Sequence, residues 1–358
     1  MTARDQAWND GSFRERVQAT LDEFVDEQAG RLAPLGDDAA RLVAEARCSV
    51  SGGKRFRAAF CYWGFRSVRD ADEDERSLVR AAAALELLHA SALVHDDYMD
   101  ASDVRRGRPA THKGFEAFHR ESGWRGDPQQ YGAAGAILLG DLLLSWSDEL
   151  LRTCGLDDDV VRAALGYFDS TRSEVIAGQF LDVSSQARGE SDVEAAMRVL
   201  RYKSAKYSIE RPLHIGAALA AAGEEVQQAL SEFGLPLGEA FQLRDDLLGV
   251  FGDQVVTGKP AGDDLSEGKR TVLVALALAG ASARDAEVLD SSLGTRLRPE
   301  DVERLRCIIE ESGAHAAVEK MIEELTSRSL DALALAPMTD AAREVLRSLA
   351  AAATQRVV

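Results

Sequence analysis

The sequence has few of the features that mark nucleic-acid-binding or membrane proteins. Its 358 residues include 42 Lys and Arg against 60 Asp and Glu, so the formal net charge is −18. An acidic chain of this kind is a poor partner for nucleic acid or for an anionic membrane surface. The longest nearly uninterrupted apolar stretch, about residues 271–281, is shorter than the ~20 residues that span a bilayer. We therefore expect no nucleic-acid partner and no membrane span.

Cysteine is scarce and scattered. The four cysteines form no CxxC pair, which argues against a disulfide framework or a zinc site and fits a reducing compartment. The first residues contain no basic segment followed by an apolar one, so no secretory signal is expected. Together these observations predict a cytoplasmic protein.

Strand-like alternation is also nearly absent, and helical patterns fill most of the chain. Hydrophobic residues make up 46% and charged residues 28%, an ordinary globular balance. Long stretches with helical patterning cover residues 78–100, 131–151, 160–186, 195–222 and 224–251, the fourth with a kink expected at Pro212. No linker or composition shift divides the chain. We predict a single all-α domain over residues 1–358, with its longest helices antiparallel around a central core.

Two carboxylate motifs each follow an apolar helical stretch. The first contains Asp96, Asp97 and Asp100, and the second contains Asp245 and Asp246. On a helix, Asp96 and Asp100 face the same way because they are four residues apart, whereas Asp97 points aside. Two carboxylates about 4 Å apart repel each other by roughly 4 kcal/mol at an effective dielectric constant near 20. A solvated acidic helix end would explain one such motif, but two favour a bound divalent cation such as Mg²⁺.

Four basic clusters accompany the acidic motifs: one precedes the first motif, one follows it, and two follow the second. They occupy residues 52–57, 103–109, 257–260 and 268–271. Arg and Lys beside Gly-rich backbone are well suited to hold phosphate oxygens. Any one cluster could be a solvated basic loop, but four beside the carboxylates predict a diphosphate site.

Five segments of the sequence resemble the motifs of a known family. The segments GGKRFR, HASALVHDDYMDASDVRRGRP, GQFLD, FQLRDD and GKPAGDDLSEGKRT occur in order between Gly52 and Thr271. This set is similar to that of the trans-isoprenyl diphosphate synthases, the polyprenyl synthetase family. The resemblance implies an antiparallel helical bundle of the isoprenoid synthase type with a central active-site cavity. It also implies a homodimer that condenses isopentenyl diphosphate with an allylic diphosphate (dimethylallyl, geranyl or farnesyl), with three Mg²⁺ ions in each site.

The resemblance also implies roles for individual residues. The expected direct metal ligands are Asp96, Asp100 and Asp245, with Asp97 and Asp246 in support. The residues expected around the allylic diphosphate are Arg105, Lys203, Ser204, Gln242, Lys259 and Lys269, with Gln179 and Asp182 lining the same cavity. The residues expected to bind isopentenyl diphosphate are Lys54, Arg57, His89 and Arg106. Arg105, Lys203, Gln242 and Lys259 are thus the expected catalytic set.

The implied mechanism needs no side-chain nucleophile. Metal ions and cations withdraw charge from the allylic diphosphate, which leaves as pyrophosphate. The double bond of isopentenyl diphosphate attacks the allylic cation, and a proton then passes to the departing pyrophosphate. One departure from the family pattern is Gly249, where a third aspartate often completes the second motif, with Asp253 one turn further on. The number of ligands from this segment is therefore left open. Ser204, where threonine is common, keeps a hydroxyl.

Product length is expected to depend on residues that precede the first motif. Ser91 and Ala92 are small, and Leu88 lies about one turn deeper, with Leu85 below it. One helical turn rises ~5.4 Å, comparable to one isoprene unit. Small residues in the first tier predict passage of the tail and a geranylgeranyl product. Farnesyl and longer polyprenyl products remain the alternatives. A longer product is left open because a facing helix, through Phe168 or Ile176, could set the floor. Ser91 and Ala92 could also be small only for helix packing.

Two other functions compete with this prediction. A class I terpene cyclase would share the first aspartate motif but would not need Lys54, Arg57 and Arg106. A non-catalytic subunit of a heteromeric synthase should have lost aspartates or cations. The retention of both sets disfavours these alternatives.

Overall fold

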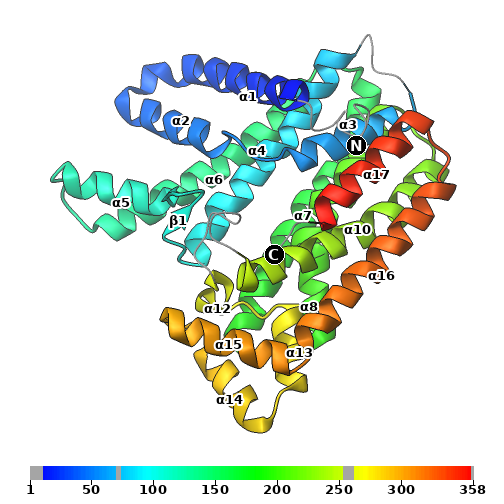
Figure 1. Ribbon diagram of the computed structural model, residues 1–358. Coiled ribbons are helices and arrows are strands. Elements are labelled where there is room, and N and C mark those ends of the chain that lie inside the picture. Colours follow the sequence, from blue (N-terminus) through cyan, green and yellow to red (C-terminus); the bar gives the residue numbers. More distant parts are fainter. Residues whose placement is uncertain (1–10, 70–73, 253–261, 356–358) are drawn as a thin grey trace.

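The structure, a computed structural model, describes residues 11–69, 74–252 and 262–355 (Figure 1). Within these ranges the chain is almost entirely helical, which confirms the predicted all-α class. The first group of helices is α1 (Gly11–Leu32), η2 (Ala33–Leu35), α2 (Asp37–Ser49), α3 (Phe56–Arg66), α4 (Glu75–Met99), α5 (Thr111–Glu121) and α6 (Pro128–Arg152). The next group is α7 (Asp158–Arg188), α8 (Val193–Val199), the π-helix η3 (Leu200–Glu210), α9 (Arg211–Leu219) and α10 (Glu224–Phe251). The last group is α12 (Asp263–Glu267), α13 (Val272–Gly280), α14 (Ala283–Ser292), α15 (Pro299–Glu311), α16 (Ala314–Leu335) and α17 (Asp340–Thr354).

Helix α4 is the centre of the larger hydrophobic core. Its sequence is apolar on every face over most of its length, which is the pattern of a helix packed on all sides. It packs mainly against α6, and also against α3 and α1. By length and hydropathy α4 is also the one helix among the described residues that could cross a membrane, but 72% of its most apolar window is buried inside the protein. Its hydropathy is therefore explained by its place in the core.

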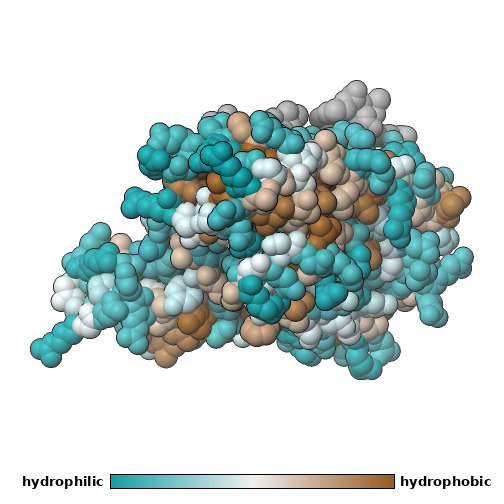
Figure 2. Space-filling view, turned by 90° about the horizontal axis from the view of Figure 1, so that it is seen from below, coloured by the Kyte–Doolittle hydropathy of each residue, from teal (hydrophilic) through white to brown (hydrophobic). Residues whose placement is uncertain are grey.

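Helix α10 joins the two hydrophobic clusters of the described chain. Its first half contributes Phe233 and Leu237 to the larger cluster around α4. Its second half contributes Leu243 and Leu247 to a smaller cluster with α13, α15 and α16. One continuous helix therefore runs through both clusters. The face seen from below in Figure 2 is mostly hydrophilic with scattered hydrophobic patches.

The predicted helix over residues 195–222 is divided differently from the expectation. Pro212 is the second residue of α9, which continues directly from the preceding helical segment. The irregularity comes just before it, as the π-helix η3. Such wide turns are rare and occur often at functional sites.

A short hairpin follows the first aspartate motif. Strand β1 (Val104–Arg105) pairs antiparallel with β2 (Arg108–Pro109), and these form the only sheet within the described ranges. Arg106 (φ 52°) and Gly107 (φ 72°) make the turn. Positive φ at both central residues is typical of a tight type I′ hairpin. This turn holds Arg105 and Arg106 close to the end of α4.

Candidate active site

One cavity of about 1190 Å³ brings the predicted motifs together. Its polar end is lined by Asp96 of the first motif, by Asp245 and Asp246 of the second, and by cations from the segments 53–57, 105–106 and 269–270. Its apolar walls come from α4, α6 and α7, and include Ala92, Ile137, Val175, Ile176 and Phe180. The combination suits a ligand with a charged head and a hydrocarbon tail.

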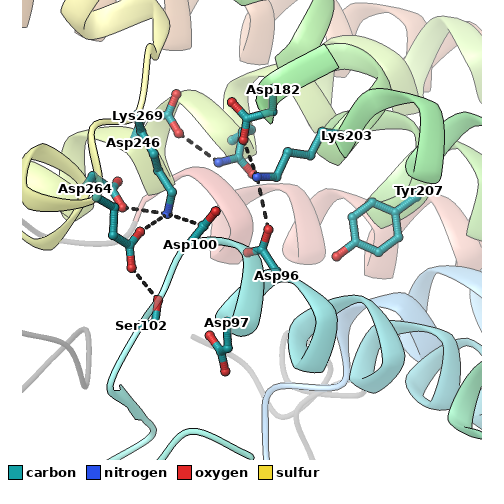
Figure 3. A network of polar contacts seen from close by, with 12 residues as sticks. Asp96, Asp97, Asp100, Ser102, Asp182, Lys203, Tyr207, Asp246, Asp264 and Lys269 are labelled. Carbon is teal, nitrogen blue, oxygen red and sulfur yellow. Dashed lines mark hydrogen bonds and ion pairs between the residues drawn. The ribbon is translucent and has the colours of Figure 1, made fainter. Parts of the chain in front are cut away.

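The side chains of the first aspartate motif point in two directions, as their spacing on a helix requires. Asp96 Oδ1 lies 3.2 Å from the Nζ of Lys203, and Asp100 Oδ2 lies 3.6 Å from the Nζ of Lys269. Asp97 points away from Asp96 and Asp100 (Figure 3). It accepts hydrogen bonds from the Nε of Arg105 at 2.9 and 3.1 Å. Asp97 thus orients an arginine of the hairpin, while Asp96 and Asp100 face cations of the opposite wall.

The electrostatics of this first motif favour one charged and one easily protonated carboxyl. Burial opposes ionisation of Asp96, but Lys203, Lys269 and Arg105 together lower its pKa. Burial and the neighbouring Asp96 raise the pKa of Asp100 to about 6. The pair therefore repels further negative charge and favours an additional cation.

The second motif lies at the end of α10. Gln242 Nε2 donates to Asp246 Oδ1 at 2.8 Å, and Asp245 lines the cavity beside them. Burial raises the pKa of Asp246 to about 8, and Asp264 and Asp245 add to this effect. A carboxyl of this kind becomes a stable anion only when more positive charge arrives.

Two lysines link elements that are far apart in the sequence. Lys203 Nζ lies 2.5 Å from Asp182 Oδ2 as well as close to Asp96. Lys269 Nζ lies 3.0 Å from Asp264 Oδ1 and 2.5 Å from Glu267 Oε2, in addition to its contact with Asp100 (Figure 3). Despite their burial, the pKa of each lysine is raised by these carboxylates. Both ammonium groups are therefore charged and offset the repulsion among the acids.

The π-helix η3 presents several polar residues to the cavity. Lys203, Ser204, Tyr207 and Ser208 all line it. Tyr207 and Ser208 were not selected from the sequence, although their spacing from Lys203 and Ser204 on a helical segment could have indicated a shared face. Gln179 and Asp182 from α7 line the same wall.

The four residues predicted for isopentenyl diphosphate all line this cavity, and two of them contact Tyr207. Arg57 donates to the hydroxyl of Tyr207 at 2.6 Å and to Ser208 Oγ at 2.8 Å. His89 Nδ1 lies 3.1 Å from the same Tyr207 hydroxyl. Burial and the nearby arginines, Arg57 foremost, lower the pKa of His89 well below its usual value, so its ring is neutral. Lys54 and Arg106 complete the lining of this region.

Not every cation of the GGKRFR segment has the same task. Arg55 is buried, pairs with buried Glu86 at 3.1 Å and donates to Val50 O at 2.5 Å. A buried charge needs such a partner, because its desolvation is costly. Both arginines line the cavity, but Arg55 is held by Glu86 and Val50 at the entry to α3, whereas Arg57 donates to Tyr207 and Ser208.

Only some of the residues predicted to control product length line the cavity. Ala92 lines the cavity. Ser91 is buried, donates to Gly140 O of α6 at 2.8 Å and is not part of the lining. Leu88 is likewise buried in the core. On the facing helix α7, Ile176 lines the cavity, whereas Phe168 is fully buried.

Two residues considered at the second motif lie outside the described part of the chain. They are Lys259 and Asp253. Their placement is therefore not assigned, and the role of Lys259 stays a prediction.

The carboxylates suit Mg²⁺ only together with a diphosphate. Within the described ranges, no three His, Cys, Asp or Glu side chains are gathered closely enough to hold a metal ion by themselves. Oxygen donors are those that Mg²⁺ prefers, and this ion is commonly held by one or two carboxylates plus substrate phosphates. The acidic residues of α4 and α10, on opposite sides of the polar end, fit that arrangement.

A chamber with apolar walls and a charged end accommodates a hydrocarbon tail and a diphosphate head. This is the chemistry of the all-α prenyltransferases. Over residues 40–312 the sequence matches the polyprenyl synthetase family. The chain belongs to this family and is an isoprenyl diphosphate synthase. That assignment disfavours the terpene cyclase considered above.

Individual relatives agree with the family. The chain is 33% identical over 302 residues to geranylfarnesyl diphosphate synthase of Aeropyrum pernix, covering 84% of this chain and 88% of that protein. It is 32% identical over 316 residues to geranylgeranyl diphosphate synthase of Saccharolobus solfataricus, covering 86% and 87%. A crystal structure of geranylgeranyl pyrophosphate synthase from Corynebacterium glutamicum, complexed with isoprenyl diphosphate and magnesium, superposes with a TM-score of 0.93 at 40% identity, covering 96% of this chain and 99% of that one. These matches confirm the isoprenoid synthase fold.

Proposed function

We propose that this trans-prenyl diphosphate synthase makes geranylgeranyl diphosphate. The observation that carries the proposal is Ala92, a small residue that lines the cavity one turn before Asp96. Beyond it the apolar walls continue through Ile137, Ile176 and Phe180. A tail can therefore pass the turn of α4 that precedes Asp96, which a bulky residue at position 92 would block. The relatives named above make products of different lengths, so their identities do not select among them.

The proposed mechanism assigns each wall of the cavity a task. Asp96, Asp100 and Asp245 would hold Mg²⁺, which supplies positive charge to the allylic diphosphate when bound. Lys203 and Arg105 stabilise the charge that develops on the departing pyrophosphate, with Arg105 oriented by Asp97.

The other residues bind and shield the reactants. Lys54, Arg57, His89 and Arg106 hold isopentenyl diphosphate so that its double bond faces the allylic carbon. The apolar walls exclude water from the allylic cation. The proton lost after condensation passes to the departing pyrophosphate.

Further features of the proposal come from the family rather than from the geometry. They are three Mg²⁺ ions in each site, a homodimeric assembly, and contacts of Lys259 and Gln242 with the allylic diphosphate. The cytoplasmic location is proposed from the cysteine pattern and the N-terminal sequence described above. The retained acids and cations support a catalytic subunit that is active without a second type of chain.

Product analysis tests this function. The purified protein is incubated with Mg²⁺, labelled isopentenyl diphosphate in excess, and dimethylallyl, geranyl or farnesyl diphosphate in turn. We expect geranylgeranyl diphosphate from each primer, measured by chromatography and mass spectrometry of the hydrolysed products. Accumulation of farnesyl diphosphate alone would refute the assigned length. Absence of turnover by the purified chain would refute its independence from a partner subunit.

A further inference from the structure

The loop between α2 and α3, residues 50–55, has a conformation that its own sequence does not favour throughout. Gly53 and Lys54 of this loop line the cavity. Three of its residues have positive φ, namely Gly52 (67°), Gly53 (97°) and Arg55 (57°). The left-handed region is strained for arginine and persists only where surrounding groups hold it. The shape of the loop therefore depends on contacts from other elements.

One of these contacts comes from α1, a helix none of whose described residues lines the cavity. This helix precedes residues 40–312, the part of the chain that matches the family. Gln18 Oε1 accepts hydrogen bonds from the backbone N–H of Gly52 at 3.1 Å and from Nη2 of Arg55 at 2.5 Å. The amide nitrogen of Gln18 donates to Asp22 Oδ1 at 3.1 Å, one turn along the same helix. Because the nitrogen is bound to Asp22, the amide oxygen is directed toward the loop.

Helix α1 is a fixed support for this contact. Val17 and Leu21 are fully buried in the larger hydrophobic cluster. Phe13 of the same helix packs against Tyr62 of α3, with ring centroids 5.1 Å apart. These three residues recur every fourth position and form the inner face of the helix. The position of Gln18 relative to α3 is therefore set by core packing.

The other contacts on the loop come from residues of the cavity itself. Arg106 Nη1 donates to Ser51 O at 2.7 Å, and Arg55 pairs with Glu86 at 3.1 Å. Arg106 and Glu86 both line the cavity, whereas Gln18 does not. Since Arg106 is also expected to bind the diphosphate, its hold on the loop changes when substrate arrives. The contact from Gln18 does not depend on what the cavity contains.

We propose that Gln18 is a positioning residue for the isopentenyl diphosphate pocket. Through Gly52 and Arg55 it holds the loop in the conformation that presents Lys54 to the diphosphate. This inference rests on the proposed function, because it assumes that Lys54 and its neighbours bind isopentenyl diphosphate. Gln18 itself does not touch the substrate and takes no part in the ionisation of the allylic diphosphate.

The effect of losing this contact should be selective for one substrate. Gln18→Met removes the acceptor and nearly conserves the size of the side chain. We expect the KM for isopentenyl diphosphate to rise about 10-fold, as for the loss of one hydrogen bond to a charged group. The kcat and the KM for the allylic substrate should stay within about 2-fold of the wild type, because Lys203 and Arg105 belong to other elements.

Gln18→Glu is the conservative variant. It keeps an oxygen acceptor at the same distance from the backbone, within reach of both Gly52 and Arg55. Its KM for isopentenyl diphosphate should therefore stay within about 2-fold of the wild type. A KM as high as that of Gln18→Met would overturn the inference, because the acceptor would then not be the group that matters.

Gln28 provides a matched control on the same helix. It is 4% exposed, and its Nε2 donates to Glu149 Oε1 of α6 at 3.0 Å. Gln28→Met should lower the melting temperature without changing the KM for isopentenyl diphosphate, because its hydrogen bond does not reach the loop. An equal rise of this KM in Gln18→Met and Gln28→Met would overturn the inference, since the effect would then come from general loosening of α1.

Initial-rate kinetics and thermal melting of the full-length protein measure these effects, with Arg57→Ala as the reference for the pocket. A wild-type KM for isopentenyl diphosphate in Gln18→Met, with a raised KM in Arg57→Ala, would overturn the role of Gln18 and leave the proposed function intact. Wild-type values in both variants would refute the pocket on which the inference rests. Should Gln18→Met fail to fold, Gln18→Asn decides the question, because its amide is one methylene too short to reach both donors.

Discussion

Ala92 and Ser91 are adjacent in the sequence but should respond in opposite ways to the same substitution. Ala92→Phe places a ring in the cavity one turn before Asp96. One turn rises ~5.4 Å, about the length of one isoprene unit. The product should therefore be shorter by about one unit, with farnesyl diphosphate replacing geranylgeranyl diphosphate. The melting temperature should change little, because the new ring occupies cavity space.

Ser91→Phe should instead damage the packing of α4 against α6. Ser91 is 3% exposed, and its hydroxyl donates to Gly140 O. Overpacking a core position costs about 1–3 kcal/mol, and losing the hydrogen bond adds roughly 1 kcal/mol. The free energy of unfolding should thus fall by about 2–4 kcal/mol, without a directed change in product length. Ser91→Ala, which removes only the hydroxyl, is the control.

The assay combines product length with stability for each variant. Products from farnesyl and geranyl diphosphate with excess isopentenyl diphosphate are identified by mass spectrometry, and unfolding is followed in urea. The reasoning is refuted if Ala92→Phe retains the wild-type product, or if Ser91→Phe yields farnesyl diphosphate at wild-type stability. The second result would show that Ser91, which the sequence indicated together with Ala92, limits product length.

Three further predictions address metal, substrate and pH. A chelator should abolish turnover, and added Mg²⁺ should restore it. Asp96→Ala should lower kcat by orders of magnitude without unfolding the protein. Turnover by this variant in the presence of chelator would contradict the metal site. Arg57→Ala should raise the KM for isopentenyl diphosphate by about 10-fold or more, since hydrogen bonds to charged groups contribute about 1.5–3 kcal/mol. Lys203→Ala should chiefly raise the KM for the allylic substrate. The reverse pattern in initial-rate kinetics would show that the two pockets are assigned the wrong way round. Burial, with Arg211 adding to it, lowers the pKa of His214 from 6.5 to about 4, so below pH 6.5 the unfolded chain takes up a proton that the folded chain does not. The contribution of neutral His214 to the free energy of unfolding is therefore complete above pH 6.5 and declines as the pH falls toward 4, by at most about 3 kcal/mol. Urea unfolding at several pH values should show a smaller decline in this free energy for His214→Gln than for the wild type. Equal declines would contradict the lowered pKa of His214.

The sequence predicted the fold class and the main helices because their signals are local and repeated. Helix α4 spans Glu75–Met99 where a helical pattern was recognised over 78–100, and α6, α7 and α10 agree to a similar degree. Apolar periodicity summed over many residues is a strong signal. The separation of Asp97 from Asp96 and Asp100 also followed from helical spacing alone.

Other features depend on contacts between distant segments, which local patterns do not report. The π-helix at Leu200–Glu210 has no distinct apolar period, so the segment was expected to be an ordinary helix. Arg55 and Arg57 are alike in sequence, but only the three-dimensional placement of Glu86 separates their tasks. The inward position of Ala92 rather than Ser91 was likewise set by the orientation of α4 against α6. The placement of Asp264 over Gly249 joins two segments whose approach no spacing rule predicts.

The all-round apolar character of α4 has a consequence during synthesis. Its principal packing partner, α6, ends about 50 residues later in the chain, which is on the order of 3 to 10 s at 5–20 residues per second. During this interval the nascent chain carries an apolar helix that resembles a membrane segment in length and hydropathy. Helices α1 and α3 emerge earlier and also contact α4, so they can cover part of its surface before α6 arrives. The order of helices along the chain thus limits how long this segment is exposed to chaperones and to aggregation at the ribosome.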